Sequence, residues 1–194
     1  PNIHETTTAH EIYEDFKDIG LDYWVSGYGT GGTFTGVSRY LKQKMPNTKL
    51  VLTEPDVAQL VGSKISQKRN ADNSALKSHS SWNPHPIQGW TTDFIPYVLQ
   101  ESIDNKYIDE LIPVSGDDGI FWANELAKKE GIITGVSGGA TFAVAVKVAE
   151  KAKKNSNILC MLPDTAERYM SSILFENINT EMSVEELEVF NSTK

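Results

Sequence analysis

The sequence predicts an α/β fold built on a mostly parallel sheet, and three observations lead to this prediction. Short apolar runs typical of buried strands alternate with longer segments in which apolar residues recur at helical spacing. Two glycine-rich segments each stand between a strand-like run and a helix-like segment. The chain has 194 residues, 39% of them hydrophobic, which is enough for a buried core without disulfides. Strands that alternate with helices imply βαβ units, in which neighbouring strands run parallel.

The first helix is predicted at 8–19, where Ile12 and Phe16 share one face and Thr8 is suited to cap the helix and pair with Glu11. The same patterns predict the other elements. Strands are expected at 21–26, 49–53, 110–114, 132–136 and 158–162, and helices at 33–45, 117–129 and 141–154, with a shorter helical stretch after Pro55.

Two segments do not fit this alternation. The segment 67–86 is polar and has no clear periodicity, so we expect a long loop, of a length that is often functional or mobile. From Met170 to Thr193 there are five acids and no base, which predicts a solvated surface segment. We therefore divide the chain into a body at 1–178 and an acidic C-terminal tail at 179–194.

Composition excludes several classes of protein. The formal net charge of −8 argues against a nucleic-acid-binding or anionic-membrane surface. Cys160 is the only cysteine, which fits a reducing compartment, and no apolar run reaches the ~18 residues of a membrane span. We expect a cytoplasmic location, with an organelle matrix as the alternative. Because the sequence begins with Pro1 rather than Met, we expect a piece of a longer polypeptide.

The first glycine-rich turn, Gly27 to Thr33, predicts a phosphate site. Glycines let a ligand approach the main chain closely, and the start of the following helix offers free N–H groups to an anion. A G-x-G-x-x-G match is present, and Glu54 lies 22 residues beyond Gly32, close to the spacing of a dinucleotide site. The threonines on either side of Gly31-Gly32 instead suit a single terminal phosphate, and Glu54 could serve turn geometry alone.

The second turn, 135–141, contains Ser137 in a G-x-S-x-G match. A serine hydrolase of that type needs its histidine after the serine, but all four histidines precede Ser137. The alternative for Ser137 is a simple helix cap. The histidines lack acidic partners at ligand spacing, so a metal site is not expected, and Cys160 is expected to be a core residue.

Five motifs, in this order, resemble the cysteine synthase family, also called O-acetylserine sulfhydrylase. They are Gly29-Thr30-Gly31-Gly32-Thr33, His85-Pro86-Ile87-Gln88-Gly89, Phe94-Ile95-Pro96, Gly135-Val136-Ser137 and Leu162-Pro163-Asp164-Thr165-Ala166-Glu167-Arg168-Tyr169. The resemblance runs from about residue 2 to residue 178. It implies fold type II of the pyridoxal-phosphate enzymes, the tryptophan synthase β-like fold, with helices on both faces of a twisted sheet that is incomplete at its N-terminal side.

The resemblance also implies a cofactor and roles for site residues. The cofactor would be pyridoxal 5′-phosphate, its phosphate held by Gly29, Thr30, Gly31, Gly32 and Thr33. Ser137 would hydrogen-bond the pyridine nitrogen, and Gln88 and Gly89 would lie beside the substrate. The family converts O-acetylserine and sulfide to cysteine and acetate by β-elimination and replacement.

The sequence departs from the family pattern in several ways. Gly138 and Ala166 stand where Ser and Gly are often expected, and 90–93 differ from the commonest form of that segment. The Schiff-base lysine of the family, in a Ser-Val-Lys-like motif after Asn-Pro, is missing. The single Asn-Pro, at Asn83, has a different context. A Ser-Gly-Asn-Thr-like substrate loop is missing as well.

The sequence therefore predicts the C-terminal portion of a cysteine synthase, inactive as it stands, without a catalytic residue of its own and without a metal. By resemblance the parent would be a homodimer and could dock the C-terminal tail of serine acetyltransferase. The alternatives are a cystathionine β-synthase-like enzyme, a non-catalytic module of the same fold that binds a ligand or partner, and a nucleotide-binding oxidoreductase.

Overall fold

The structure, a computed structural model, describes residues 1–176, 179 and 181–193. Its helices and strands are, in chain order, α1 (Asn2–Thr6), α2 (Thr8–Phe16), β1 (Tyr23–Gly27), α3 (Gly32–Lys44), β2 (Lys49–Pro55), α4 (Tyr97–Asp104), β3 (Glu110–Val114), α5 (Gly116–Glu130), α6 (Val136–Ala149), β4 (Ile158–Cys160), the 3-10 helices η1 (Ala166–Tyr169) and η2 (Ile173–Phe175), and α7 (Val184–Ser192).

The described strands form one parallel sheet in the order β3-β2-β1-β4, which confirms the α/β prediction. The chain builds β1, β2 and β3 outward in one direction and then returns through α5 and α6 to place β4 on the other side of β1. The strand order therefore reverses between β1 and β4. In open parallel sheets, the crevice at the carboxyl ends of such strands is the usual ligand site.

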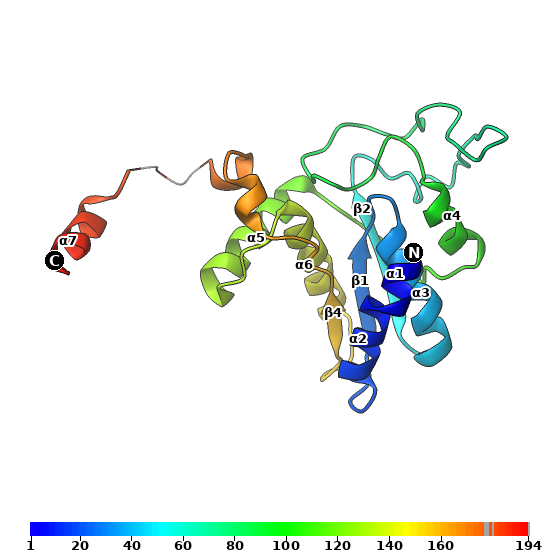
Figure 1. The fold of residues 1–194 in the computed structure, drawn as a ribbon, viewed down its shortest axis with the longest axis horizontal. Coiled ribbons are helices and arrows are strands. Elements are labelled where there is room, and N and C mark those ends of the chain that lie inside the picture. Colours follow the sequence, from blue (N-terminus) through cyan, green and yellow to red (C-terminus); the bar gives the residue numbers. More distant parts are fainter. Residues whose placement is uncertain (177–178, 180, 194) are drawn as a thin grey trace.

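Helices cover both faces of the sheet, so the core has two parts (Figure 1). In β1, Trp24 belongs to the cluster under α2, α3 and α4, whereas its neighbour Val25 belongs to the cluster under α5 and α6. In β2, Leu50 and Leu52 lie in the first cluster and Val51 in the second. Side chains of a strand alternate between faces, and both faces are apolar here because both are covered.

The predicted strand at 132–136 is wrong. Residues 131–135 are irregular, and α6 begins at Val136 rather than at 141. An apolar β-branched run becomes a strand only beside another strand, and none of the described strands pairs with this one. Instead the Thr134 hydroxyl donates to the Asp164 carbonyl at 3.1 Å, and the Gly135 N–H donates to the Asp164 carboxylate at 3.3 Å.

The helical stretch predicted after Pro55 is also wrong. The chain forms turns there because the buried Glu54 carboxylate accepts from the N–H groups of Val61 and Gly62. The segment 67–86 is irregular, as predicted, apart from one antiparallel bridge between Arg69 and Ala75. Helices α1, α4 and α7 are not among the elements predicted from the sequence.

Helix α4 is short, and its packing explains why it forms. It follows Pro96 and buries Leu99, while its Ser102 hydroxyl lies 2.9 Å from the Thr35 hydroxyl of α3. An eight-residue helix is marginal in water, so this tertiary contact rather than the local sequence decides it.

The predicted boundary of the acidic tail falls at residue 178, which lies outside the described residues. Within the predicted tail, α7 starts with a capping box in which the Ser183 hydroxyl and Glu186 carboxylate accept from each other's backbone N–H, and the helix buries no residue. None of the helices in the described parts of the chain has the length and apolar character needed to span a membrane.

Candidate functional site

A cavity of about 170 Å³ lies where the carboxyl ends of β1 and β4 meet, at the reversal of strand order. Five segments line it: the end of β1 at Gly27, the loop and helix start that follow, residues 88–90, the first turns of α6, and the segment that follows β4. The predicted site residues that line it are Gly29, Thr33, Gln88, Gly89 and Ser137.

The N-terminus of α3 opens beside this cavity and carries no negative charge. Its N-cap is Gly31 at φ +83°, a left-handed conformation that favours glycine, and no side chain caps the first turn, which contains no acid. By contrast, α5 is capped by the Ser115 side chain and carries Asp117 and Asp118 in its first turn. Unlike α5, α3 therefore keeps its free N–H groups and positive dipole end available to an anion.

Gly29 brings two loops into close contact. A Cβ on Gly29 would lie 2.3 Å from the carbonyl oxygen of Gly89, so the glycine loop and the 88–91 loop touch through main chain alone. The Thr91 N–H donates to the Tyr28 carbonyl at 2.8 Å and holds the same two loops together. This contact forms the part of the cavity wall where the predicted phosphate and substrate residues adjoin.

The other predicted phosphate residues lie outside this cavity. Thr30 lines a neighbouring cavity of about 570 Å³, together with Arg69 and Tyr97. A Cβ on Gly31 would meet Leu99 of α4 at 2.7 Å, so this glycine also permits close helix packing. Gly32 donates weakly to the Thr30 hydroxyl, at 3.4 Å.

Ser137 lies in the first turn of α6 and is 3% exposed. The Thr141 hydroxyl donates to the Ser137 carbonyl at 2.8 Å, but no described residue bonds the Ser137 hydroxyl. The hydroxyl does not cap α6, because no side chain caps that helix. A hydroxyl without a protein partner on a cavity wall is suited to a ligand atom.

Trp90 closes the cavity from the side of the 88–91 loop. A Cβ on Gly27 would lie 2.1 Å from the Trp90 indole, which therefore packs directly on the end of β1. The indole is 8% exposed and belongs to the second core cluster. The departure from the family pattern at this position thus places a large aromatic wall beside Gln88 and Gly89.

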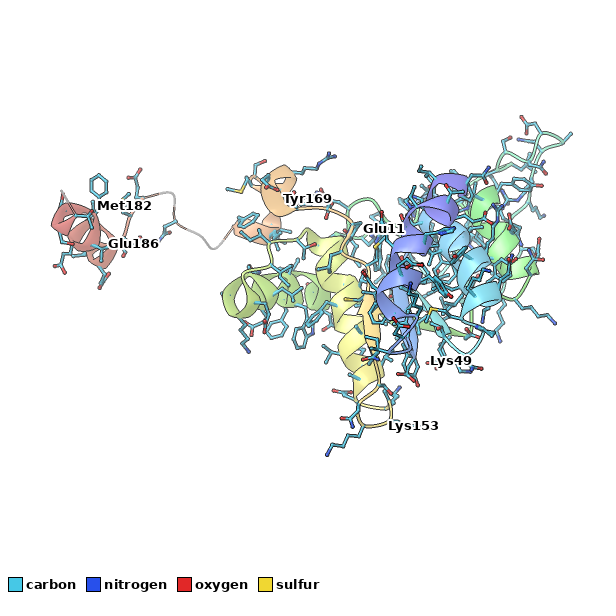
Figure 2. All side chains as sticks on the ribbon, turned by 60° about the horizontal axis from the view of Figure 1, so that its bottom comes forward. Glu11, Lys49, Lys153, Tyr169, Met182 and Glu186 are labelled. Atoms are coloured by element: carbon cyan, nitrogen blue, oxygen red, sulfur yellow. The ribbon has the colours of Figure 1, made fainter. Side chains whose placement is uncertain are left out.

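Two residues of the cavity wall, Asp164 and Tyr169, belong to the fifth of the motifs named above but were not predicted as site residues. The Tyr169 hydroxyl of η1 donates to the Asp164 carboxylate, and this bond raises the pKa of Tyr169 to about 12. The same carboxylate accepts from the N–H of Gly135, the N-cap residue of α6. Figure 2 labels Tyr169 on η1. Their position just after β4, at the carboxyl end of a parallel strand, is the signal that could have identified them.

The structure argues against Glu54 as the acidic residue of a dinucleotide-binding site. Its carboxylate is fully buried and accepts from the Tyr28 hydroxyl at 2.8 Å and from the N–H groups of Val61 and Gly62 at 3.1 and 2.8 Å. Burial raises the pKa of Glu54, and these three donors oppose that shift. With its oxygens engaged inside the protein, Glu54 is not placed to accept from a ribose hydroxyl.

None of the histidines lines the cavity with Ser137. His79 and His85 contact backbone groups, His10 contacts Tyr40, and His4 contacts Thr8 and Thr33. The serine-hydrolase alternative is therefore excluded by the positions of the histidines in the structure as well as by their order in the sequence. The described residues also contain no group of three or more potential metal-ligating side chains.

Cys160 behaves as the core residue that the sequence predicts. It packs against the second core cluster, and burial raises the pKa of its thiol to about 11. A thiol that stays protonated at neutral pH is a poor nucleophile, so Cys160 takes no part in the chemistry of the cavity.

The chain is similar to known proteins in both sequence and structure. A family model described as "Pyridoxal-phosphate dependent enzyme" matches residues 2–164. The chain is 38% identical over 179 residues to O-ureido-L-serine synthase of Streptomyces lavendulae, which covers 92% of this chain and 49% of the relative. It is 37% identical over 189 residues to cysteine synthase A of Escherichia coli (strain K12), covering 96% of this chain and 54% of the relative.

Among solved structures, a lysine-to-alanine mutant of O-ureido-L-serine synthase with O-ureido-L-serine bound matches with a TM-score of 0.82 at 36% identity. The match covers 98% of this chain and 53% of that one. The chain thus spans about half the length of the curated relatives it matches.

Proposed function

Because the chain belongs to the family of pyridoxal-phosphate dependent enzymes, we propose that the cavity between β1 and β4 holds the cofactor of a cysteine synthase. The α3 start, with Gly29 and Thr33 on the cavity wall, binds the phosphate, while Thr30, Gly31 and Gly32 shape the loop. The Ser137 hydroxyl binds the pyridine nitrogen.

Observations from this structure support the fit of the cofactor. The start of α3 is uncapped and free of acids, as a phosphate site requires. The Ser137 hydroxyl faces the same cavity and has no partner among the described residues. When bound, pyridoxal phosphate supplies an electron sink at the α-carbon of an amino acid. A neutral hydroxyl at the pyridine nitrogen, unlike a carboxylate, need not keep that nitrogen protonated, which favours β-elimination.

The reaction that we propose for the parent protein is replacement at the β-carbon of an O-activated serine, with O-acetylserine and sulfide giving cysteine and acetate. Gln88 and Gly89 line the cavity and are the proposed substrate contacts. The identity to O-ureido-L-serine synthase is as high as that to cysteine synthase A, so a different nucleophile at the same β-carbon is the second candidate. A cystathionine β-synthase-like enzyme would likewise use a different nucleophile at this β-carbon.

The Schiff-base lysine of this chemistry lies, in our proposal, in a part of the parent outside this chain. No lysine among the described residues lines the cavity, and the sequence has no Ser-Val-Lys-like motif. As a 194-residue chain the protein would then hold the cofactor without completing the reaction. The parent would be a cytoplasmic or organelle-matrix homodimer that can dock the C-terminal tail of serine acetyltransferase.

The test supplies the parent with pyridoxal phosphate and O-acetylserine and offers sulfide, homocysteine or hydroxyurea in separate reactions. Release of cysteine with sulfide is the expected result. Cystathionine or O-ureido-L-serine as the dominant product would replace cysteine synthase by the corresponding alternative. Absence of all three products, with no binding of pyridoxal phosphate, would favour the non-catalytic module.

A further inference from the structure

A second cavity, of about 570 Å³, lies between the segment 67–86 and residues 93–98, beside the start of α4 (Figure 1). The described residues that line it include none of those that line the first cavity, between β1 and β4. Its wall carries two cations, one acid and two aromatic rings, which are Arg69, Lys77, Asp93, Phe94 and Tyr97. The second cavity therefore has a chemical character of its own.

Arg69 is held on the cavity wall by neutral groups. Its guanidinium donates to the carbonyl oxygen of Ile95 at 2.7 Å and to that of Asn73 at 3.2 Å. It also donates weakly to the Gln100 side chain at 3.4 Å, and its carbon Cζ lies 5.5 Å from the centre of the Tyr97 ring. In the described part of the chain no carboxylate forms an ion pair with it. The positive charge is thus fixed in position but not neutralised, and two of the five N–H donors remain for a ligand.

The charges of the wall do not cancel. Lys77 adds a second cation, and its ammonium group forms no ion pair with any residue that the structure describes. Among the described residues, Asp93 is the only acid on the wall, and its carboxylate accepts from the Ser78 hydroxyl. Two cations and one acid leave a formal charge of +1 on the wall, although the whole chain carries −8. A monoanion is the ligand that balances this charge.

The uncharged part of the wall indicates what the anion is attached to. Phe94 and Tyr97 offer aromatic rings, and Pro96 and Val98 add aliphatic surface. Aromatic rings of this kind bind apolar or aromatic groups of a ligand, whereas a guanidinium binds a carboxylate through charge-assisted hydrogen bonds. A carboxylate that carries an apolar group matches both parts of the wall.

We propose that the second cavity is a binding site for a small monocarboxylate: Arg69 and Lys77 bind the carboxylate, and the aromatic rings cover the apolar group. The proposal does not rest on the proposed function, because neither cation lines the first cavity. The wall includes Thr30 of the glycine loop and Asp93, two residues beyond the 88–91 loop. An occupant would therefore adjoin both loops that meet beside the first cavity.

The probe is 4-fluorophenylacetate, added to the 194-residue chain and followed by fluorine NMR. The matched control ligand is 4-fluorophenylacetamide, which has nearly the same shape but no charge. We expect the wild-type chain to bind the acid with a Kd on the order of 1 mM. The amide should bind at least about fivefold more weakly, because it cannot form a charge-assisted bond to either cation. Added salt should weaken the binding of the acid through screening.

Two substitutions test the charges of the wall. Lys77→Gln should lower the affinity for the acid about 3- to 10-fold, through loss of one charged donor. Lys68→Gln removes an exposed lysine of the same segment that does not line the cavity, and it should leave the affinity unchanged. In Asp93→Asn the negative charge is lost while the amide oxygen can still accept from Ser78, so the affinity should rise about 2- to 5-fold. A gain of affinity is not the result of a damaged fold.

Arg69→Gln should abolish detectable binding of the acid. Because it also removes the bonds to Ile95 and Asn73, the variants at Lys77 and Asp93 decide the matter if it does not fold. Absence of binding to the wild-type chain, equal affinities for acid and amide, equal effects of Lys77→Gln and Lys68→Gln, or no gain in Asp93→Asn would each overturn the proposal.

None of these results bears on the proposed cofactor site. That site is tested separately with pyridoxine 5′-phosphate, an analogue that lacks the aldehyde and therefore binds without a lysine. The failure of one proposal is thus distinguishable from the failure of the other.

Discussion

The Tyr28 hydroxyl donates to the Glu54 carboxylate at 2.8 Å, and both side chains are buried in the first core cluster or at its edge. Tyr28 belongs to the glycine loop, and Glu54 is the penultimate residue of β2. Because Glu54 also binds the N–H groups of Val61 and Gly62, one carboxylate joins the proposed phosphate loop to the neighbouring strand and its turn. This bond stabilises the site from behind rather than taking part in it.

Tyr28→Phe should destabilise the protein by about 1–3 kcal/mol, because it leaves a buried carboxylate short of one donor. The free energy of unfolding from urea denaturation measures this. Tyr40→Phe is the matched control: the Tyr40 hydroxyl lies 3.4 Å from His10 at the surface, so its removal should change stability by less than about 0.5 kcal/mol. Equal effects of the two variants would contradict the structural role of the Tyr28 bond.

Glu54 should also give the protein an unusual dependence on pH. Burial raises its pKa in the folded state above the ordinary value of 4.5, so the folded chain holds this proton more tightly than the unfolded chain. The contribution of Glu54 to stability is therefore largest below pH 4.5 and declines as pH rises through the raised pKa. The stability of wild type relative to Glu54→Gln, measured by denaturation from pH 4 upward, should fall as pH rises. A constant difference would show that the carboxylate does not titrate as its burial requires.

The two glycines at 29 and 32 should respond differently to alanine. In Gly29→Ala the new Cβ would lie 2.3 Å from the Gly89 carbonyl oxygen, so a loop must move, at about 1–3 kcal/mol. In Gly32→Ala the nearest atom is the Thr30 hydroxyl at 3.6 Å, an ordinary contact, and stability should be unchanged or slightly higher. Thermal unfolding measures the stability of both variants, and phosphorus NMR of added pyridoxine 5′-phosphate measures their binding of this compound. Loss of binding is expected only in Gly29→Ala.

Ser137→Ala tests the pyridine contact separately from folding. The Ser137 hydroxyl makes no bond to a described residue, so its removal should change the free energy of unfolding by less than about 0.5 kcal/mol. Affinity for pyridoxine 5′-phosphate should nevertheless fall about 2- to 10-fold through the lost hydrogen bond. A large loss of stability with unchanged affinity would make Ser137 a structural residue instead.

Local sequence was sufficient to predict the strands that are covered by helices on both faces. Val25 and Leu52, for example, lie in continuous apolar runs, which this environment requires. It was insufficient at Ile133, where the same composition lacks a neighbouring strand, and at α4, whose formation depends on the contact of Ser102 with α3. Both errors have the same cause: the residues that decide the local structure are tertiary partners that lie far away in the sequence.

The candidate site could be predicted to a similar extent. Glycine turns between a strand and a helix led to Gly29 and Ser137 because such turns lie at the carboxyl edge of a parallel sheet. Glu54 remained open between two roles until its buried partners were seen. Asp164 accepts hydrogen bonds both from Tyr169 and from Gly135 at the start of α6, a relationship set by folding rather than by spacing.

The ion pair of Arg39 with Glu101 joins α3 to α4 and predicts a pH dependence of the opposite sign to that of Glu54. Its atoms lie 2.5 Å apart, and the hydrogen bonds from Arg39 lower the pKa of Glu101. Because the pKa of Glu101 is lowered in the folded state, this contribution is complete above the ordinary value of 4.5 and is lost as pH falls through the folded pKa. Arg39→Ala should therefore cost about 1 kcal/mol at neutral pH, since the pair is partly exposed, and progressively less in acid.

High salt should reduce the same loss through screening. Lys147→Ala, which removes a more exposed pair to Asp118, is the control and should cost less at every pH. Denaturation at neutral and acidic pH, with and without added salt, measures both variants. A loss in Arg39→Ala that does not change with pH would mean that packing of its aliphatic chain, rather than its charge, holds α3 against α4.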